Sequence, residues 1–264
     1  RMIAEKVAEL STILDVMIEI DSGGRRGGVQ WSSPSLIEIG RIINSSSGLN
    51  LVGVLSHAGH SYLCKTEAEL IAVAEQERFS VASAAEQLRK AGLPCPIVSV
   101  GATPTALFAE HLSGITEMRP GVYTLFDVTQ SALGCCSIND IAVSVLASII
   151  GHGSAGSYAL VDAGALALSQ DRSAEHFSEG AGYGIVFDEQ GKKRCHDVNV
   201  NNVNQEHGFL RSLSNHLPYS ELAIGSRVRI FPNHSCMTTA PYDKYYVVDG
   251  SDQIVEIWDK LTAW

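Results

Sequence analysis

The sequence predicts half of a parallel (β/α)8 barrel followed by an antiparallel β domain. In the first half, four apolar strands each lead into a polar or glycine-rich loop, and helix signals follow the loops. In the second half, short strands and turns succeed one another without a convincing amphipathic helix. Alternating strands and helices favour a parallel sheet, whereas short strands between turn residues favour antiparallel pairing. We place the boundary between 134 and 140, which gives domains 1–136 and 137–264.

The first strand is the apolar run Leu14–Ile20, and it ends in a loop, 21–28, that is rich in glycine and contains two arginines. Ser33 and Pro34 then suit a helix N-cap and a first helical position, because serine accepts a backbone hydrogen bond and proline needs no donor there. We expect this helix to run toward Ser46.

The second strand spans 51–55 and leads into the loop 56–62, which contains two histidines and a tyrosine. Thr66 and Glu69 have the spacing of a capping box, which predicts the start of a long helix. Gly92 suits the end of that helix, since glycine readily adopts the left-handed conformation found there.

The third strand, 96–100, runs into the small-residue loop 101–105 and a short helix through Leu112. A turn at 117–121 precedes the fourth predicted strand, 122–126. The strands expected in the second half are 141–150, 158–162, 183–188, 227–231, 245–248 and 254–258.

Composition indicates a soluble globular protein, with 45% hydrophobic and 18% charged residues among 264. A net charge of −10 argues against nucleic acid or an anionic membrane as the main partner. No apolar run is long enough to span a bilayer, and the first residues lack the apolar core of a signal peptide. Six cysteines, with Cys135 and Cys136 adjacent, do not suggest a disulfide framework, so we expect a cytoplasmic protein.

His234 and Cys236 form a candidate metal site at the predicted end of the strand 227–231. Side chains alternate between the faces of a strand, so residues two apart point the same way. An imidazole and a thiolate together suit Zn²⁺, and two protein ligands leave positions open for water or substrate. With 9 His and 6 Cys in the chain, an H-x-C sequence also arises by chance, which leaves a role without metal open.

The loops that follow the barrel strands hold further candidates. Gly101–Thr105 offers backbone N–H groups, hydroxyls and a helix start, which together suit a phosphate, although an ordinary helix cap has the same residues. Arg26 can direct a cation into the barrel mouth or lie as a surface charge. His57, His60 and Tyr62 place three hydrogen-bonding groups within six residues.

Five segments occur in an order that resembles one known family. They are Asp21–Val29, Ser56–Tyr62, Gly101–Thr105, Arg119–Tyr123 and Pro232–Thr238, and Asp162–Gly164 with Ser169 and Glu206–Gly208 match as well. Together they resemble the D-serine dehydratase/D-threonine aldolase family of pyridoxal-phosphate enzymes, which is related to alanine racemase. The resemblance covers nearly the whole chain. It implies an alanine racemase-like fold, with a (β/α)8 barrel that holds pyridoxal 5′-phosphate, a β domain, and assembly as a homodimer.

The resemblance also implies roles for individual residues. Arg26 would lie against the cofactor ring, His57 would stack on the ring or sit beside it, and Tyr62 would line the site; His57 and Tyr62 are the candidate catalytic residues. His234 and Cys236 would hold Zn²⁺, or Mn²⁺ or Co²⁺, to grip the substrate's β-hydroxyl. The phosphate would be held by Thr103 and the backbone of Gly101, Ala102, Gly121 and Val122.

Two departures from the family pattern stand out. The family binds its cofactor through a lysine on the first barrel strand, in a stretch resembling Arg-Pro-His-x-Lys-Thr-His-Lys, and nothing here matches it. The seven lysines are Lys6, Lys65, Lys90, Lys192, Lys193, Lys244 and Lys260. We therefore expect this sequence to be the C-terminal portion of a longer protein that supplies the Schiff-base lysine and covers two open sheet edges. Ala165 and Leu166 replace a Ser-Lys pair that relatives often carry.

The function implied is that of a lyase acting on a D-3-hydroxy amino acid, similar to D-serine dehydratase. Cleavage of the Cα–Cβ bond, as in D-threonine aldolase, is an alternative that uses the same metal position, although H-x-C rather than H-x-D resembles the dehydratase branch. A racemase of the same fold needs no metal, so the His234–Cys236 pair argues against it. A non-catalytic cofactor-binding protein is favoured only by the absent lysine.

Overall fold

The computed structural model describes residues 2–251 and 253–261 and divides into two compact units, Arg1–Gly121 and Val122–Trp264. Residues 122–136, which the sequence places in the first domain, cluster with the second unit. They are bound to the second unit by hydrogen bonds: Asp127 accepts one from the backbone of Ser235 at 3.0 Å, and the hydroxyl of Thr129 donates to the carbonyl of Asn233 at 2.8 Å.

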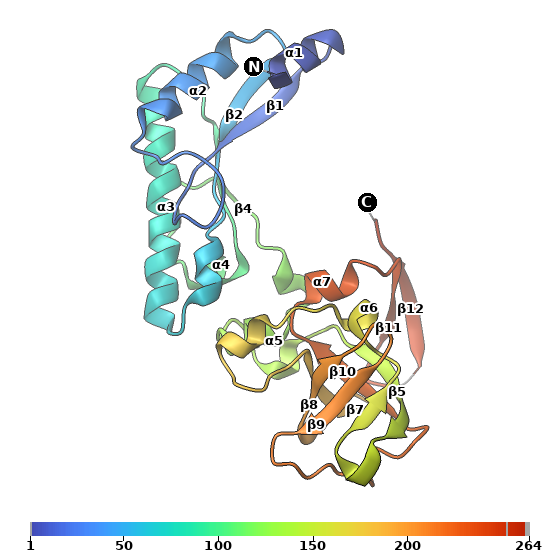
Figure 1. The fold of residues 1–264 in the computed structure, drawn as a ribbon. Helices are drawn as coiled ribbons and strands as arrows, with labels where there is room; N and C mark the ends of the chain where they lie inside the picture. Colours follow the sequence, from blue (N-terminus) through green and yellow to red (C-terminus); the bar gives the residue numbers. More distant parts are fainter. Residues whose placement is uncertain (1, 252, 262–264) are drawn as a thin grey trace. The chain divides into compact units, whose positions relative to one another are not determined.

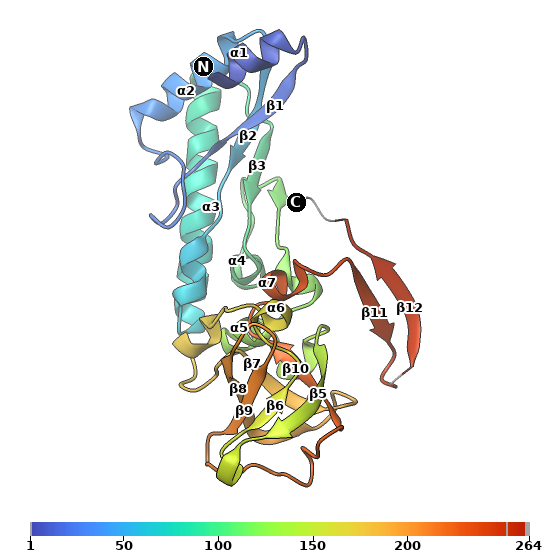
Figure 2. The ribbon, with the colours of Figure 1, turned by 45° about the vertical axis from the view of Figure 1, so that its right-hand side comes forward.

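The first unit is a four-stranded parallel sheet in the order β1-β2-β3-β4. Two helices pack on the same face of this sheet, as Figures 1 and 2 show. Their apolar side chains and those of the strands form one buried cluster that includes Leu36, Val54 and Leu88. This arrangement fits a partial α/β barrel. The elements are β1 (Leu14–Glu19), α2 (Pro34–Ser45), β2 (Leu49–Leu55), α3 (Glu67–Lys90), β3 (Ile97–Val100) and β4 (Glu117–Met118).

The sequence signals for the two helices are confirmed. The Ser33 hydroxyl accepts the backbone N–H of Ser35 at 3.3 Å, and Pro34 opens α2. Thr66 and Glu69 form the expected capping box at the start of α3, because each side chain accepts from the other's backbone. These signals act within one turn of chain, which is why the sequence reveals them.

The fourth predicted strand is wrong. Residues Val122–Thr124 form a short 3₁₀ helix, η2, and the fourth strand is the two-residue β4, in which Glu117 and Met118 pair with β3. Pro120 has no N–H to continue the ladder, so the pairing ends there. Two helices also differ from expectation: α1 (Met2–Glu9) was not predicted, and α4 (Thr103–Phe108) ends before Leu112.

The second unit is a closed antiparallel barrel with strand order β10-β5-β6-β9-β8-β7. Its core holds Ile149, Val198, Leu210 and Ile230, each at most 1% exposed. Two of its strands, β8 and β9, were missed by the sequence because polar residues interrupt their apolar pattern. The barrel strands are β5 (Val145–His152), β6 (Ala159–Val161), β7 (Gly184–Asp188), β8 (Arg194–Val203), β9 (Gly208–Ser212) and β10 (Arg227–Pro232).

Short helices and one hairpin complete this unit. The helices are α5 (Val128–Ala132), α6 (Ala165–Leu168) and α7 (Ser235–Thr239). The hairpin pairs β11 (Lys244–Val248) with β12 (Ile254–Asp259), as the sequence predicts.

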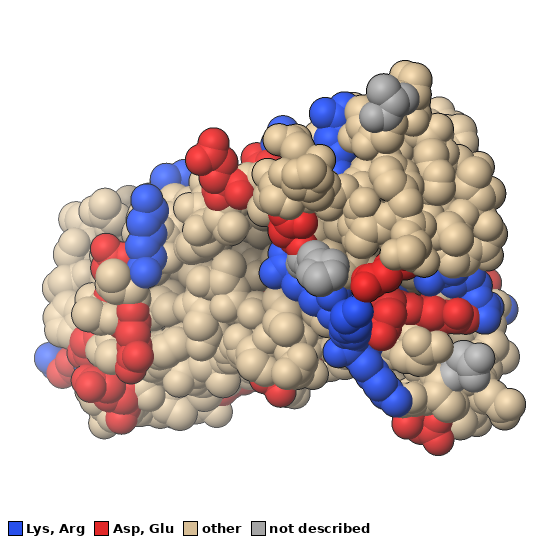
Figure 3. Space-filling model, turned by 90° about the horizontal axis from the view of Figure 1, so that it is seen from below, with Lys and Arg blue, Asp and Glu red and all other residues tan. Residues whose placement is uncertain are grey.

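General features agree with the composition. Among the described residues, no helix is long and apolar enough to cross a membrane. All six cysteines are free thiols. On the face displayed in Figure 3, acidic and basic side chains lie beside one another.

Candidate functional site

The candidate cofactor residues lie at one edge of the parallel sheet in the first unit. Because β1 to β4 run in the same direction, the loops at their carboxyl ends share that edge. The loops are 20–29, 56–62, 101–105 and 119–121, and they contain Arg26, His57, Tyr62, Gly101, Ala102, Thr103 and Gly121.

Arg26 is held against the second loop by close backbone packing. A Cβ atom at Gly59 would approach the Nε atom of Arg26 to 2.9 Å, so only glycine lets the guanidinium lie there. The first loop is closed beside β1 by Gly28, whose φ of +110° is unfavourable for other residues and whose added Cβ would meet the Glu19 carbonyl at 2.7 Å. Gly28 in the first loop and Gly59 in the second therefore set the position of the Arg26 guanidinium.

His57 lies among cations and is half-buried. Burial lowers its pKa from the ordinary value of 6.5, and the charges of Arg26 and Arg119 lower it further, while a hydrogen bond with the backbone of Gly101 opposes the shift. The imidazole is therefore neutral at pH 7. Its ring stacks toward Tyr62, with centroids 6.3 Å apart and planes 26° from parallel.

Arg119 is a residue whose side chain was not singled out from the sequence. Its Nη2 atom donates to the carbonyl of Ser56 at 2.5 Å, and its Nε atom donates to the hydroxyl of Ser99 at 2.8 Å. The guanidinium thus spans the ends of β2 and β3. The sequence shows only an arginine before proline, so its reach across two strands could not be read from it.

Glu77 is the second residue that the sequence did not reveal. It is 1% exposed on α3. Its carboxylate accepts the backbone N–H groups of Ala58 at 2.9 Å and Gly101 at 3.3 Å, and the Thr105 hydroxyl at 2.7 Å. Burial raises the pKa of Glu77, while these hydrogen bonds and the charge of Arg119 oppose the shift. One carboxylate therefore joins the loops that carry His57 and Thr103.

The residues proposed for the phosphate differ in their surroundings. Gly101, Ala102 and Thr103 are buried where α4 begins, and the Gly101 amide is engaged by Glu77. Gly121 is exposed, and an added Cβ would meet no atom within 4 Å. Val122 is buried in the second unit. Of this set, the backbone of Gly101 is hydrogen-bonded to His57.

The metal pair adopts a geometry that differs from the predicted one. The pair does not lie on a strand: His234 is the N-cap of α7, with φ −138° and ψ 101°, and Cys236 lies within that helix. Asp127 explains this bend, since its carboxylate accepts the backbone N–H groups of Ser235, at the start of α7, and of Gln130, in α5. The imidazole of His234 is nevertheless hydrogen-bonded to the side chain of Cys236.

Asp171 also contacts His234. Its Oδ2 atom lies 3.0 Å from Nδ1 of the imidazole, although 63 residues separate the two in the chain. The hydrogen bonds with Asp171 and then with Cys236 raise the pKa of His234 to about 10 in the absence of metal, and the bond with His234 lowers the pKa of Asp171. Nothing in the local sequence marks Asp171 as a neighbour of His234.

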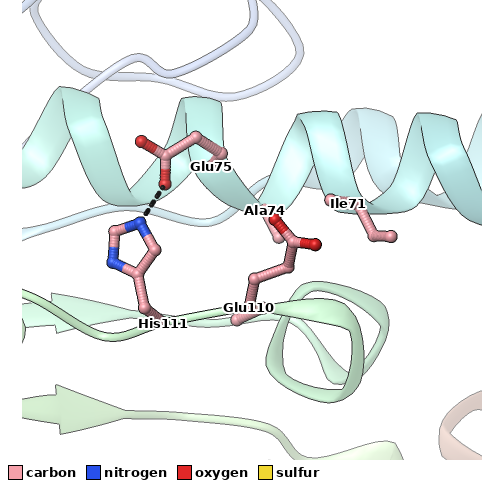
Figure 4. Close-up of a pocket in the computed structure, with 6 residues that line it drawn as sticks. Ile71, Ala74, Glu75, Glu110 and His111 are labelled. Carbon is pink, nitrogen blue, oxygen red and sulfur yellow. Dashed lines mark ion pairs between the residues drawn. The ribbon is translucent and has the colours of Figure 1, made fainter.

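A small cavity beside α3 lies apart from these residues. Ile71, Ala74 and Glu75 line it together with Glu110 and His111, and Figure 4 shows the Glu75–His111 ion pair, with Nε2 and Oε2 3.4 Å apart. Its volume of about 50 Å³ is too small for an organic cofactor. Within the described residues, no three His, Cys, Asp or Glu side chains are arranged as metal ligands.

Comparisons with known proteins match both units. Residues 1–128 match the model of the alanine racemase N-terminal domain, and residues 142–248 match that of a putative serine dehydratase domain. D-threo-3-hydroxyaspartate dehydratase from Delftia sp. (strain HT23) is 44% identical, over 97% of this chain and 68% of its own length. D-serine dehydratase from Dictyostelium discoideum is 33% identical, over 94% of this chain and 64% of its own length.

Solved structures agree. A cysteine-to-alanine variant of D-threo-3-hydroxyaspartate dehydratase, in the metal-free form, superposes with a TM-score of 0.92 at 42% identity, over 99% of this chain and 69% of that one. A histidine-to-alanine variant of the dehydratase is also solved, and the two substituted positions are two residues apart. D-threonine aldolase from Filomicrobium marinum gives a TM-score of 0.78 at 26% identity, over 97% of this chain and 65% of that one. The chain therefore belongs to the D-serine dehydratase/D-threonine aldolase family, whose fold is that of alanine racemase.

Proposed function

We propose that this protein is a pyridoxal 5′-phosphate- and divalent-metal-dependent lyase that dehydrates a D-3-hydroxy amino acid. The contact between His234 and Cys236 carries the proposal, because it brings together an imidazole and a thiol in a chain that is 44% identical to a dehydratase. The same spacing of two residues separates the substituted histidine and cysteine of that relative.

The residues at the sheet edge fit a flat, anionic, aromatic cofactor. Arg26 and Arg119 supply positive charge beside His57, and the His57–Tyr62 stack supplies a flat surface. Ser61 is fully buried in the same loop, and its hydroxyl has no hydrogen-bond partner among the described residues. Ala102 and Thr103 would hold the phosphate at the start of α4, and the backbone of Gly101 and Gly121 would border it.

The second set of residues fits a metal ion of borderline softness. One imidazole nitrogen and one thiolate sulfur are the donor types that Zn²⁺ accepts most readily, and Mn²⁺ or Co²⁺ can take the same place. Cys236 is exposed, and the His234 side chain is 37% exposed, so solvent and substrate can reach both donors.

The proposed roles of the side chains follow from their charge and protonation. When bound, the two cofactors would supply an electron sink for charge at Cα and a Lewis acid for the β-oxygen. His57 is neutral at pH 7, so its imidazole can accept a proton. Arg26 and Arg119 would orient the ring and its phosphate, and Tyr62 would border the substrate.

The test compares the parent protein with Cys236→Ala. We expect the variant to lose bound zinc and lyase turnover while it keeps the absorbance of the bound cofactor, because the candidate cofactor residues lie on other segments. Cys136→Ala is the matched control, since Cys136 is a free, half-buried thiol that lies outside α7. Parental turnover by Cys236→Ala after chelation would refute the metal-dependent function.

Products distinguish the two lyase reactions. Dehydration of D-serine or D-threo-3-hydroxyaspartate yields ammonia and a 2-oxo acid, whereas cleavage of D-threonine between Cα and Cβ yields glycine and acetaldehyde. We expect ammonia and the 2-oxo acid. We further propose that the protein acts as a homodimer in the cytoplasm, a reducing compartment that suits six free thiols. Sedimentation of the purified protein would test the assembly.

A further inference from the structure

Asp171 is placed to control which ring nitrogen of His234 is available. Its Oδ2 atom lies 3.0 Å from Nδ1, and the side chains of Asp171 and His234 are 25% and 37% exposed. A carboxylate only accepts hydrogen bonds, so Nδ1 must carry the proton that joins them. The proton on Nδ1 leaves the lone pair of the neutral imidazole on Nε2.

The carboxylate of Asp171 is itself fixed. Its Oδ1 atom accepts the backbone N–H of Ser173 at 2.7 Å, and the backbone N–H of Asp171 donates to the hydroxyl of Ser169 at 3.2 Å. Ser169 has a φ of +67°, a conformation that turns the chain sharply after α6. The segment 169–173 is thus folded around this one side chain.

The same segment is tied to the chain that carries His234. The side-chain NH₂ of Asn233, a residue that is 1% exposed, donates to the backbone carbonyls of Asp171 at 3.1 Å and Gly182 at 2.6 Å. The Thr129 hydroxyl lies 2.7 Å from that of Ser173 and donates to the Asn233 carbonyl at 2.8 Å. The separation between Asp171 and His234 is therefore set by buried hydrogen bonds on both sides.

We propose that Asp171 is a positioning residue for the metal: it holds His234 as the Nδ1–H tautomer, so that Nε2 binds the ion beside Cys236. This inference rests on the metal-dependent function proposed above. Carboxylates that accept from a ligating histidine fix the ring and increase its basicity, and their loss typically weakens metal affinity by about 10–100-fold. Both carboxylate oxygens of Asp171 already have partners, so its role differs from that of a third ligand.

The experiment measures zinc affinity by competition with a chromophoric chelator, using the parent, Asp171→Ala, Asp171→Asn and Asp197→Ala. Asp197 is the matched control, because its carboxylate also accepts a serine hydroxyl and a backbone N–H, which come from Ser212 and Ser214 rather than from the chain that carries His234. We expect about 10–100-fold weaker binding for Asp171→Ala, a smaller loss for Asp171→Asn, and no change for Asp197→Ala. The asparagine can still accept from Nδ1, which makes it the conservative rescue.

Nitrogen NMR of ¹⁵N-histidine-labelled protein with zinc gives the second readout. We expect Nδ1 of His234 to be protonated and Nε2 to be metal-bound in the parent. Zinc on Nδ1 would overturn the inference, as would parental affinity in Asp171→Ala. If the parent itself bound no zinc, the proposed metal function would fail first. If Asp171→Ala failed to fold, the nitrogen assignment in the parent and in Asp171→Asn would decide, because a purely structural role predicts no preference of zinc for Nε2.

Discussion

His57 illustrates how much of this site depends on the surroundings of a single residue. Its sequence neighbours reveal a histidine in a polar loop, but its pKa depends on burial and on two arginines from other loops, Arg26 and Arg119. The sequence also singled out Arg26, because it lies in a glycine-rich loop after a barrel strand, at the position that resembles the family's ring-contacting arginine. Arg119 was missed as a side chain, since its two hydrogen-bond partners belong to distant strands.

At this scale we predict the titration of His57 and its response to Arg26→Leu. The NMR midpoint of the parent should lie below 6.5, since burial and the arginines disfavour the imidazolium. The stability that His57 contributes is then present above pH 6.5 and lost as the pH falls through the folded-state pKa. Arg26→Leu should move the midpoint upward and weaken cofactor binding.

Arg25→Leu is the matched control for that variant, because the charges that lower the pKa of His57 are those of Arg26 and Arg119. We expect its midpoint and its cofactor affinity to stay at the parental values. Equal effects of the two substitutions would show that net charge in the loop, rather than the position of Arg26, determines the pKa of His57.

At the scale of elements, the sequence predicted the features that depend on neighbouring residues and did not predict those that depend on contacts between distant residues. The caps of α2 and α3 and the strands β1 to β3 follow from residues within a few positions of one another. The two-residue β4 exists because Glu117 and Met118 meet β3, and α7 begins where Asp127 accepts the Ser235 N–H. These last two features depend on contacts from far along the chain, so the pattern at residues 117–126 and 229–236 misled the prediction.

Glu77 provides the prediction for this scale. Glu77→Ala should leave the N–H groups of Ala58 and Gly101 without their acceptor, which costs about 1–3 kcal/mol for each buried group. Glu77→Gln should lose much less, because an amide oxygen can accept from both and its NH₂ can reach Thr105. Denaturant unfolding of the purified variants would measure the two free energies; similar losses for both would mean that the charge of Glu77, not its oxygens, is essential.

For the whole molecule, most of the candidate cofactor residues lie in the first unit and the candidate metal pair lies in the second. In the second unit, the barrel strands pair in a closed ring around a buried apolar cluster, so folding of the barrel does not require an ion. The sequence predicted an antiparallel domain but not closure of the barrel. Closure requires β8 and β9, which are inconspicuous in the sequence: charged residues and asparagines outnumber the valines of β8, and β9 has only two consecutive apolar side chains, Phe209 and Leu210.

We therefore predict that removal of metal leaves the protein folded. A chelator should abolish turnover while the far-ultraviolet circular dichroism and the cooperative unfolding transition persist. The Tm should decrease only by the amount that binding of the ion contributes to stability. Cys236→Ala without chelator should unfold at the temperature of the chelated parent. Collapse of the barrel signal on chelation would identify a structural zinc site instead.

The position of Cys236 in the first turn of α7 has an evolutionary consequence. The first turn of a helix favours negative charge, so a carboxylate there suits the backbone as well as a thiolate does. Substitution of this one residue would exchange sulfur for oxygen, and so would change the hardness of the proposed donor and the preferred metal while the scaffold is unchanged. Cys236→Asp should accordingly fold as the parent does, bind zinc more weakly, and gain affinity for Mn²⁺ relative to zinc; equal losses for both ions would show that the scaffold tolerates only sulfur.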